Sequence, residues 1–204
     1  MAKLPEPPAS LRVAAQKTTL GRGSRWWRIY SAGGRYPTAW NGFRFFGPTT
    51  CRFDHHDPPA ATQAKGILYA ADDPVTCLAE VFQATRLIDR WANDPWLVGF
   101  ELGRNVEALD LTGAWPTRAG ASMAICSGPR PRARRWSRAI HAAYPEVEGL
   151  LYASAMHANR ASIALYERAQ SAMPAAPVFH RALADAALLG RLDAAARTLG
   201  YRLV

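Results

Sequence analysis

The passage from a short apolar run into Asp73 and Pro74 constrains the fold of this chain more than any other feature. Residues 67–71 (ILYAA) have the length and the apolar, aromatic composition of a buried strand. Asp73 is a favourable N-cap, and Pro74 suits the first helical position. A buried strand that leads directly into a helix requires a sheet with helices packed on it. We expect this helix to continue through residues 75–91.

Other strand candidates are spread along the chain with no regular alternation of strand and helix. They are residues 26–30 (WWRIY), 40–53 with one or two short strands, 96–111 with two, 148–153 (EGLLYA), 163–168 (IALYER, a strand or a helix start) and 201–204 (YRLV). The remaining C-terminal residues are alanine-rich and predict helix, with Gly190 and Gly200 as breakers. This pattern predicts an α+β fold. We expect an N-terminal arm over residues 1–24 and one compact domain over residues 25–204.

Composition limits the class of protein. Hydrophobic residues make up 49% of the 204-residue chain and charged residues 20%, as in globular domains. No apolar run reaches the ~18 residues of a membrane span, and the first residues lack the apolar core of a secretory signal. Cys51, Cys77 and Cys126 are too widely spaced for a disulfide framework or a cysteine zinc site. We therefore expect a cytoplasmic protein with no membrane partner.

The chain is basic, with 25 Lys and Arg against 16 Asp and Glu and a formal net charge of +9. Five arginines lie between Arg130 and Arg138 (RPRARRWSR). This basic run is a candidate nucleic-acid patch, but a solvated arginine face or a surface for an acidic protein explains it equally well. Trp136 is the one aromatic residue within it, so it lacks the interleaved aromatics of a base-stacking platform. Direct nucleic-acid binding is therefore not expected.

A second polar cluster, Asp54-His55-His56-Asp57, contains residue types that bind metal ions. Adjacent residues rarely face the same ion, and no His-x-x-x-His helix elsewhere in the sequence supports a metal site. We expect a polar turn here and no metal. The glycine-rich phosphate motifs of Rossmann and P-loop proteins are also absent from the sequence.

Five further residues lie at or near the ends of expected strands. They are Arg28, Arg52, Tyr69, Glu80 and Ser154. Three of them have an ordinary explanation: an exposed helix position for Glu80, a core position for Tyr69, and a loop or helix cap for Ser154. Arg28 and Arg52 lie in apolar or aromatic stretches, where a buried arginine needs an anionic partner. Together, two arginines suit a pyrophosphate and a tyrosine suits a base or ribose face, while a carboxylate stabilises the ribosyl cation of a breaking N-glycosidic bond. The set predicts a site that cleaves a dinucleotide at this bond.

The stretches that carry these residues resemble the RES-domain toxins of bacterial toxin–antitoxin pairs, a family named after its arginine, glutamate and serine. The matching stretches are WRIY at 27–30, CRF at 51–53, GILYA at 66–70, LAEVF at 78–82 and LYAS at 151–154. The specificity of the resemblance lies in the ordered set. It implies a compact fold with a mixed or antiparallel sheet and flanking helices, similar to ADP-ribosyltransferase toxins. Residues 25–204 are then an NAD-binding catalytic domain.

The resemblance also implies an activity and a partner. Members degrade NAD by hydrolysis or phosphorolysis, or transfer ADP-ribose to a protein, and an antitoxin with an Xre-like helix-turn-helix region blocks their active site. For this chain the resemblance implies an enzyme with NAD as substrate and no resident cofactor, and it leaves a homo-oligomer open. A non-enzymatic nucleic-acid-binding module and an inactive relative that binds proteins are the remaining alternatives.

Residue by residue, the resemblance implies specific roles. Arg28 and Arg52 would hold the NAD phosphates or the nicotinamide-side ribose, and Tyr69 would pack against the nicotinamide or its ribose. Glu80 would stabilise the ribosyl cation and orient the attacking water, phosphate or acceptor. Glu80, Arg28 and Arg52 are thus the expected catalytic set, and Ser154 would position the substrate by a hydrogen bond.

Overall fold

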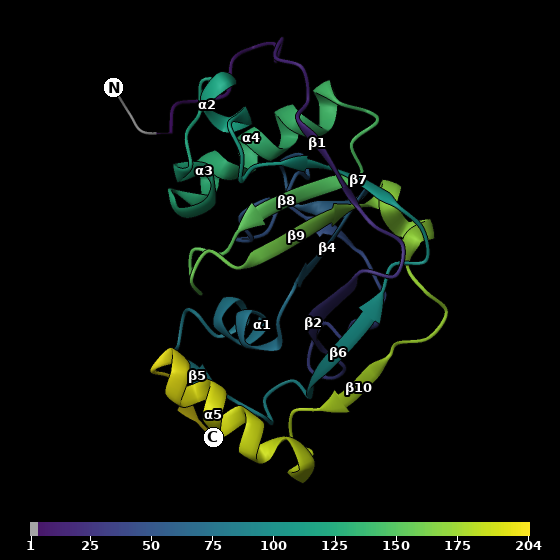
Figure 1. The fold of residues 1–204 in the computed structure, drawn as a ribbon, viewed down its shortest axis with the longest axis vertical. Coiled ribbons are helices and arrows are strands. Elements are labelled where there is room, and N and C mark those ends of the chain that lie inside the picture. The colour runs from purple at the N-terminus through teal and green to yellow at the C-terminus, as the bar shows by residue number, and fades with distance from the viewer. Residues whose placement is uncertain (1–3) are drawn as a thin grey trace.

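The computed structural model describes residues 4–204, whose strands form one broad main sheet flanked by helices (Figure 1). Within these residues the main sheet has nine strands. In spatial order they are β1 (Lys17–Leu20), β7 (Val106–Asp110), β8 (Gly149–Ala153), β9 (Ala161–Tyr166), β4 (Ala61–Ala71), β2 (Arg25–Ser31), β6 (Pro95–Glu101) and β10 (Phe179–Ala182), with β3 (Arg44–Gly47) beside β4. Neighbouring strands are antiparallel except for β7 and β8, which are parallel. This confirms the expected α+β class with a mixed, mostly antiparallel sheet.

Five helices and two 3-10 turns flank the sheet in the described part of the chain. They are α1 (Pro74–Val81), α2 (Trp115–Arg118), α3 (Ala124–Ser127), α4 (Arg130–Ala143), η1 (Glu167–Ala172), η2 (Ala186–Leu188) and α5 (Leu189–Leu199). In Figure 1, α2, α3 and α4 gather at one end of the molecule, whereas α5 lies at the other end with the parallel pair β5 (Leu87–Ile88) and β11 (Arg202–Leu203). No helix within residues 4–204 is both long and apolar enough to cross a lipid bilayer.

The main sheet opens between β4 and β2. In the described chain these two strands are joined at a single pair of residues, Trp27 and Ala71. By contrast, β2 pairs with β6 over its whole length, and β4 pairs with β9 over residues 67–71. Helix α1 contacts β2, β4 and α5, so it lies in the angle where the two halves of the sheet diverge (Figure 1).

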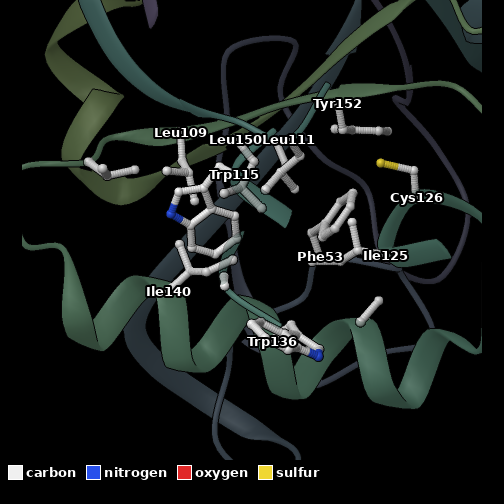
Figure 2. Close-up of a cluster of buried hydrophobic side chains, with 14 of the residues drawn as sticks. Phe53, Leu109, Leu111, Trp115, Ile125, Cys126, Trp136, Ile140, Leu150 and Tyr152 are labelled. Atoms are coloured by element: carbon white, nitrogen blue, oxygen red, sulfur yellow. The ribbon is translucent and has the colours of Figure 1, made fainter. Parts of the chain in front are cut away.

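The largest buried cluster lies between α4 and the half of the sheet that contains β7, β8 and β9 (Figure 2). Helix α4 places Trp136 and Ile140 on one face, and both are fully buried. The loop before β4 inserts Phe53, whose ring centroid lies 4.7 Å from that of Tyr152 on β8. Phe53 therefore anchors its chain neighbour, Arg52, against the core.

Two expected elements differ from the structure in their extent. The helix expected over residues 75–91 begins after Asp73 as predicted, but it ends at Val81. Arg86 then turns the chain with a φ of 53°, and β5 pairs with β11, so pairing with the C-terminus overrides the helical pattern. Gly190 is not a helix breaker, because it lies in the first turn of α5, whereas Gly200 ends that helix with a left-handed φ of 65°.

The N-terminal segment lies along α4 before it enters the sheet as β1. Leu4 is 3% exposed and belongs to the buried cluster around α4. The carboxylate of Glu6 pairs with Arg132 at 3.1 Å and with Arg135 at 2.5 Å. Strand β1 then pairs with β7 at one edge of the main sheet. These contacts hold the described part of the N-terminal segment against the rest of the fold.

Candidate active site

Glu80 and Ser154 come from separate elements and are joined by a short hydrogen bond. Glu80 lies in the last turn of α1, and Ser154 directly follows β8. The Ser154 hydroxyl donates to Oε1 of Glu80 at 2.6 Å and accepts the backbone N–H groups of Met156 and His157, each at 3.2 Å. Ser154 is 1% exposed, and Glu80 is half-buried. Glu80 is therefore not the exposed helix residue that its place off the apolar face indicated.

A second set of hydrogen bonds links Glu80 to the start of α4. The side-chain amide of Gln83 donates to the backbone carbonyl of Glu80 at 2.6 Å and to its Oε2 at 3.3 Å. Oε1 of Gln83 accepts a hydrogen bond of 2.5 Å from Arg130, the first residue of α4. The sequence pattern did not indicate Gln83 or Arg130 as site residues. Gln83 lies three residues after Glu80, and this i, i+3 spacing is the one sequence signal that relates the two residues. Nothing in the sequence relates Arg130 to Glu80.

Arg52 approaches the same region from the loop between β3 and β4. Its NH1 donates to the carbonyl oxygen of Gly128 at 2.5 Å, two residues before Arg130. Burial lowers the pKa of Arg52, the positive charge of Arg130 lowers it further, and the charge of Glu80 raises it. Arg52, Arg130 and Glu80 are therefore close enough to interact electrostatically, and Arg52 stays cationic at neutral pH.

Arg28 lies in the middle of β2, one residue from the point at which the sheet opens. Its NH1 donates to the backbone carbonyl oxygens of Trp40 at 2.9 Å and Gly42 at 3.0 Å. Burial lowers the pKa of Arg28 to about 10, which leaves it cationic at neutral pH. The thiol of Cys77 in α1 donates to the carbonyl oxygen of Trp27 at 3.0 Å, so α1 is held against β2 beside Arg28.

Tyr69 lies in β4, opposite Ala164 of β9, and its ring packs against the largest buried cluster. This agrees with the core position that its strand pattern indicated. Its hydroxyl is buried and forms no hydrogen bond with any described residue. Burial, followed by the neighbouring Cys51, raises the pKa of Tyr69 well above its usual value. The hydroxyl is therefore neutral at neutral pH.

A cavity of about 400 Å³ lies beside these residues, between α3 and the loop after β8. This volume is within the range of small-molecule sites. It adjoins the site on two sides, because two lining residues flank Ser154 and another precedes Gly128, which binds Arg52. The lining residues are Ser122, Met123, Ala124, Cys126, Ser127, Ala153, Ala155 and Asn159.

The Asp54-His55-His56 part of the histidine cluster is buried, so the expectation of a polar turn is wrong. All three side chains are fully buried, and they follow Arg52 in the loop between β3 and β4. Nδ1 of His56 lies 2.5 Å from Oδ1 of Asp54, and Oδ2 of Asp54 accepts from the Thr49 backbone and hydroxyl. Although burial alone raises the pKa of Asp54, these hydrogen bonds and the charge of Arg44 hold it well below its usual range.

His55 faces a different acid and forms a second group with His141 and Glu167. One ligand atom from each lies within 4.8 Å of the other two, which meets the distance requirement of a metal site. Nε2 of His55 lies 3.2 Å from one carboxylate oxygen of Glu167, and Nε2 of His141 lies 2.8 Å from the other. The Arg168 guanidinium is 3.8 Å from the same carboxylate. Nδ1 of His55 has no hydrogen-bond partner among residues 4–204, whereas a metal-bound histidine needs one. These features fit a hydrogen-bonded group that holds His55 and its loop in place better than they fit a metal centre.

The basic run is largely engaged within the protein. Four of its arginines donate hydrogen bonds: Arg130 to Gln83, Arg132 and Arg135 to Glu6, and Arg138 to the backbone carbonyl of His56. Arg134 forms no hydrogen bond or ion pair with the residues that the structure describes. The run therefore does not form a continuous free cationic face, which weakens its interpretation as a nucleic-acid patch.

The fold and the site together define a class of protein: an α+β domain with arginine, glutamate and serine side chains where its sheet opens. The chain belongs to the RES domain family, whose model matches residues 25–186. This confirms the family that the ordered sequence motifs indicated.

A solved structure shares the fold. The chain aligns with a chain of the M. tuberculosis MbcT–MbcA toxin–antitoxin complex with a TM-score of 0.56 and 18% sequence identity. The alignment covers 86% of this chain and 92% of the other. At this identity the alignment shows a common fold. A comparison with curated proteins finds no match.

Proposed function

We propose that this protein is the toxin of a toxin–antitoxin pair, and that it cleaves the nicotinamide–ribose bond of NAD by hydrolysis or phosphorolysis. Membership of the RES domain family and the fold shared with a toxin–antitoxin complex support the toxin role. The observation that carries the enzymatic role is the 2.6 Å hydrogen bond from Ser154 to Glu80. It holds a carboxylate in a defined orientation close to the cationic side chains of Arg52 and Arg130.

In this proposal the substrate lies in the angle between the two halves of the sheet. Arg28 and Arg52 bind its phosphates or the nicotinamide-side ribose, and Tyr69 packs against the nicotinamide or its ribose. The bond from the ribose C1′ to the nicotinamide nitrogen breaks, and its electron pair leaves with neutral nicotinamide. The carboxylate of Glu80 stabilises the positive charge that develops on the ribosyl ring. Water or phosphate then forms a bond to C1′, and attacking water loses its proton to Glu80 or to solvent.

Ser154 acts in this proposal as a positioning residue rather than as a direct substrate contact. Its hydroxyl hydrogen is donated to Glu80, and its oxygen accepts two backbone N–H groups. A serine hydroxyl offers one donor and two acceptor positions, so all three are used. We therefore assign to Ser154 the orientation of the Glu80 carboxylate.

We also propose an antitoxin protein with an Xre-like region as the partner that blocks the site. The family and the shared fold support a protein partner, and the net charge of +9 favours a partner with an acidic surface. We propose that the activity acts in the cytoplasm, where NAD and such a partner would meet the protein. A pull-down of the chain with its co-expressed neighbouring gene product tests this part.

Release of nicotinamide, followed by proton NMR, tests the enzymatic part. Protein purified without antitoxin is incubated with NAD in the presence and absence of phosphate, and dependence on phosphate separates phosphorolysis from hydrolysis. Glu80→Gln keeps the side-chain shape but removes the negative charge, so we expect kcat to fall about a hundredfold or more. Glu101→Gln is the matched control and should retain full activity. Glu101 lies on β6, and its partly exposed carboxylate pairs with Arg25 of β2.

Each outcome of this experiment has a defined meaning. NAD that stays intact in every buffer refutes cleavage by the free protein. NAD consumption that requires an added protein, with ADP-ribose label on that protein, replaces hydrolysis by ADP-ribosyl transfer. Full activity in folded Glu80→Gln refutes the role of Glu80.

A further inference from the structure

Two guanidinium groups near Glu80, and that of Arg28 on β2, have only neutral hydrogen-bond partners among the described residues. Arg28 and Arg52 donate to backbone carbonyl oxygens, and Arg130 donates to the side-chain amide of Gln83. A partly buried cation without a counter-charge is unfavourable, so such a group at a site indicates an anionic ligand. Nine other arginines in the described chain pair with carboxylates: Arg25, Arg44, Arg104, Arg132, Arg135, Arg160, Arg168, Arg181 and Arg197.

Arg52 and Arg130 converge on one turn of the backbone between α3 and α4. Arg52 donates to the carbonyl oxygen of Gly128, and Arg130 begins α4 two residues later. Their charges act on each other, because Arg130 adds to the effect of burial in lowering the pKa of Arg52. The same turn is the N-terminus of the 14-residue helix α4, which has no side-chain cap and whose positive end adds to the field.

Gln83 spans the gap between these cations and Glu80. Its side-chain amide contacts both Glu80 and Arg130, so one amide group separates the Arg130 guanidinium from the Glu80 carboxylate. In a nicotinamide dinucleotide, one ribose ring and its C5′ group separate the glycosidic bond from the two linked phosphates. The spacing of Glu80 and Arg130 therefore suits a molecule whose C1′ lies at Glu80 and whose phosphates lie at the α3–α4 turn.

We propose that Arg52 and Arg130 form a diphosphate subsite at the α3–α4 turn, and that Arg130 exchanges the Gln83 amide for a phosphate oxygen when the substrate binds. This inference rests on the proposed cleavage of NAD and names the part of the protein that selects a dinucleotide. Two guanidinium groups match the charge of two linked phosphates and can each bind bidentately. The adjoining cavity of about 400 Å³ has no charged side chain in its lining, so it receives the neutral nucleoside end.

Isothermal titration calorimetry with ADP-ribose tests the subsite, because ADP-ribose retains both linked phosphates and lacks the nicotinamide. Arg130→Ala is expected to weaken binding about tenfold or more, as the loss of one charge-assisted contact. The matched control is Arg134→Ala, one turn further along α4, which should bind within about twofold of the wild type. AMP carries a single phosphate, so Arg130→Ala should weaken its binding less.

Gln83→Ala separates a phosphate contact from a structural role of Arg130. If Arg130 served only to anchor Gln83, this variant would lose ADP-ribose affinity as strongly as Arg130→Ala. We expect it to bind within about twofold of the wild type, because the released guanidinium still reaches the phosphates. Thermal melting of each variant confirms that the comparison is made on folded protein.

The outcomes separate this subsite from the cleavage reaction. Arg130-dependent binding of ADP-ribose to a protein that releases no nicotinamide supports the subsite and refutes the reaction. Nicotinamide release together with equal ADP-ribose affinity in Arg130→Ala and Arg134→Ala refutes the subsite and leaves the reaction intact. Absence of ADP-ribose binding to the wild type refutes the subsite.

Discussion

Replacing Ser154 with alanine tests whether its hydroxyl orients Glu80. The change removes the donor to Oε1 of Glu80 at 2.6 Å and the acceptor of two backbone N–H groups. Among the described residues, the Glu80 carboxylate then keeps only the amide of Gln83, at 3.3 Å from Oε2. A carboxylate held by one long contact samples more orientations, so fewer bound substrate molecules face it correctly.

The size of the effect follows from the hydrogen bond that is lost. A hydrogen bond to a charged group is worth about 1.5–3 kcal/mol, which corresponds to roughly a 10- to 150-fold change in rate. We expect Ser154→Ala to lower kcat by this factor with little change in KM, because its hydroxyl does not reach the substrate phosphates in the proposed site. Loss of the acceptor for the two backbone N–H groups costs about 1 kcal/mol of unfolding free energy.

Steady-state nicotinamide release and urea unfolding near neutral pH separate the two effects. Ser162→Ala is the matched control, because Ser162 is 1% exposed on the neighbouring strand β9 and its hydroxyl has no hydrogen-bond partner among the described residues. That variant should keep both kcat and stability. A wild-type kcat in folded Ser154→Ala refutes the positioning role. A higher KM at constant kcat shows instead that Ser154 holds the substrate.

Two further predictions concern stability. Burial lowers the pKa of His55 from 6.5 to about 4, so below pH 6.5 the unfolded chain takes up a proton that the folded protein excludes. The free energy of unfolding should therefore fall by about 3 kcal/mol as the pH drops from 6.5 to 4, and urea unfolding that is constant over this range contradicts the burial of a neutral His55. Trp136→Ala opens a cavity in the cluster of Figure 2 and should cost about 3–5 kcal/mol in urea unfolding. Trp91→Ala, at a position 63% exposed, should cost less than about 0.5 kcal/mol.

Local signals in the sequence predicted those parts of the fold that depend on neighbours along the chain. Asp73 accepts from the backbone N–H of Val75 and caps α1, because capping needs only adjacent residues. The early end of α1 depends on the pairing of β5 with β11, which lies more than a hundred residues further along the chain. No local pattern contains that pairing, so the expected helix was too long.

The site shows the same division. Glu80 and Ser154 were predicted because ordered motifs surround each of them, but their mutual hydrogen bond joins residues 74 positions apart. The bond from Arg130 to Gln83 spans 47 positions, and Arg130 lies within a run in which Arg132 and Arg135 bind the N-terminal segment instead. Composition cannot distinguish one arginine of a run from the next, since their roles are assigned by tertiary contacts.

The single pair of residues that joins β4 to β2 makes the site an interface within one chain. Arg28 belongs to one half of the sheet, Tyr69 and Ser154 belong to the other, and Glu80 comes from the helix between them. The angle between the halves therefore decides whether the site is assembled. Core substitutions that keep each half intact but alter this angle would yield a stable, fully folded protein without activity. Screens for loss of toxicity should recover such variants far from any residue that touches substrate.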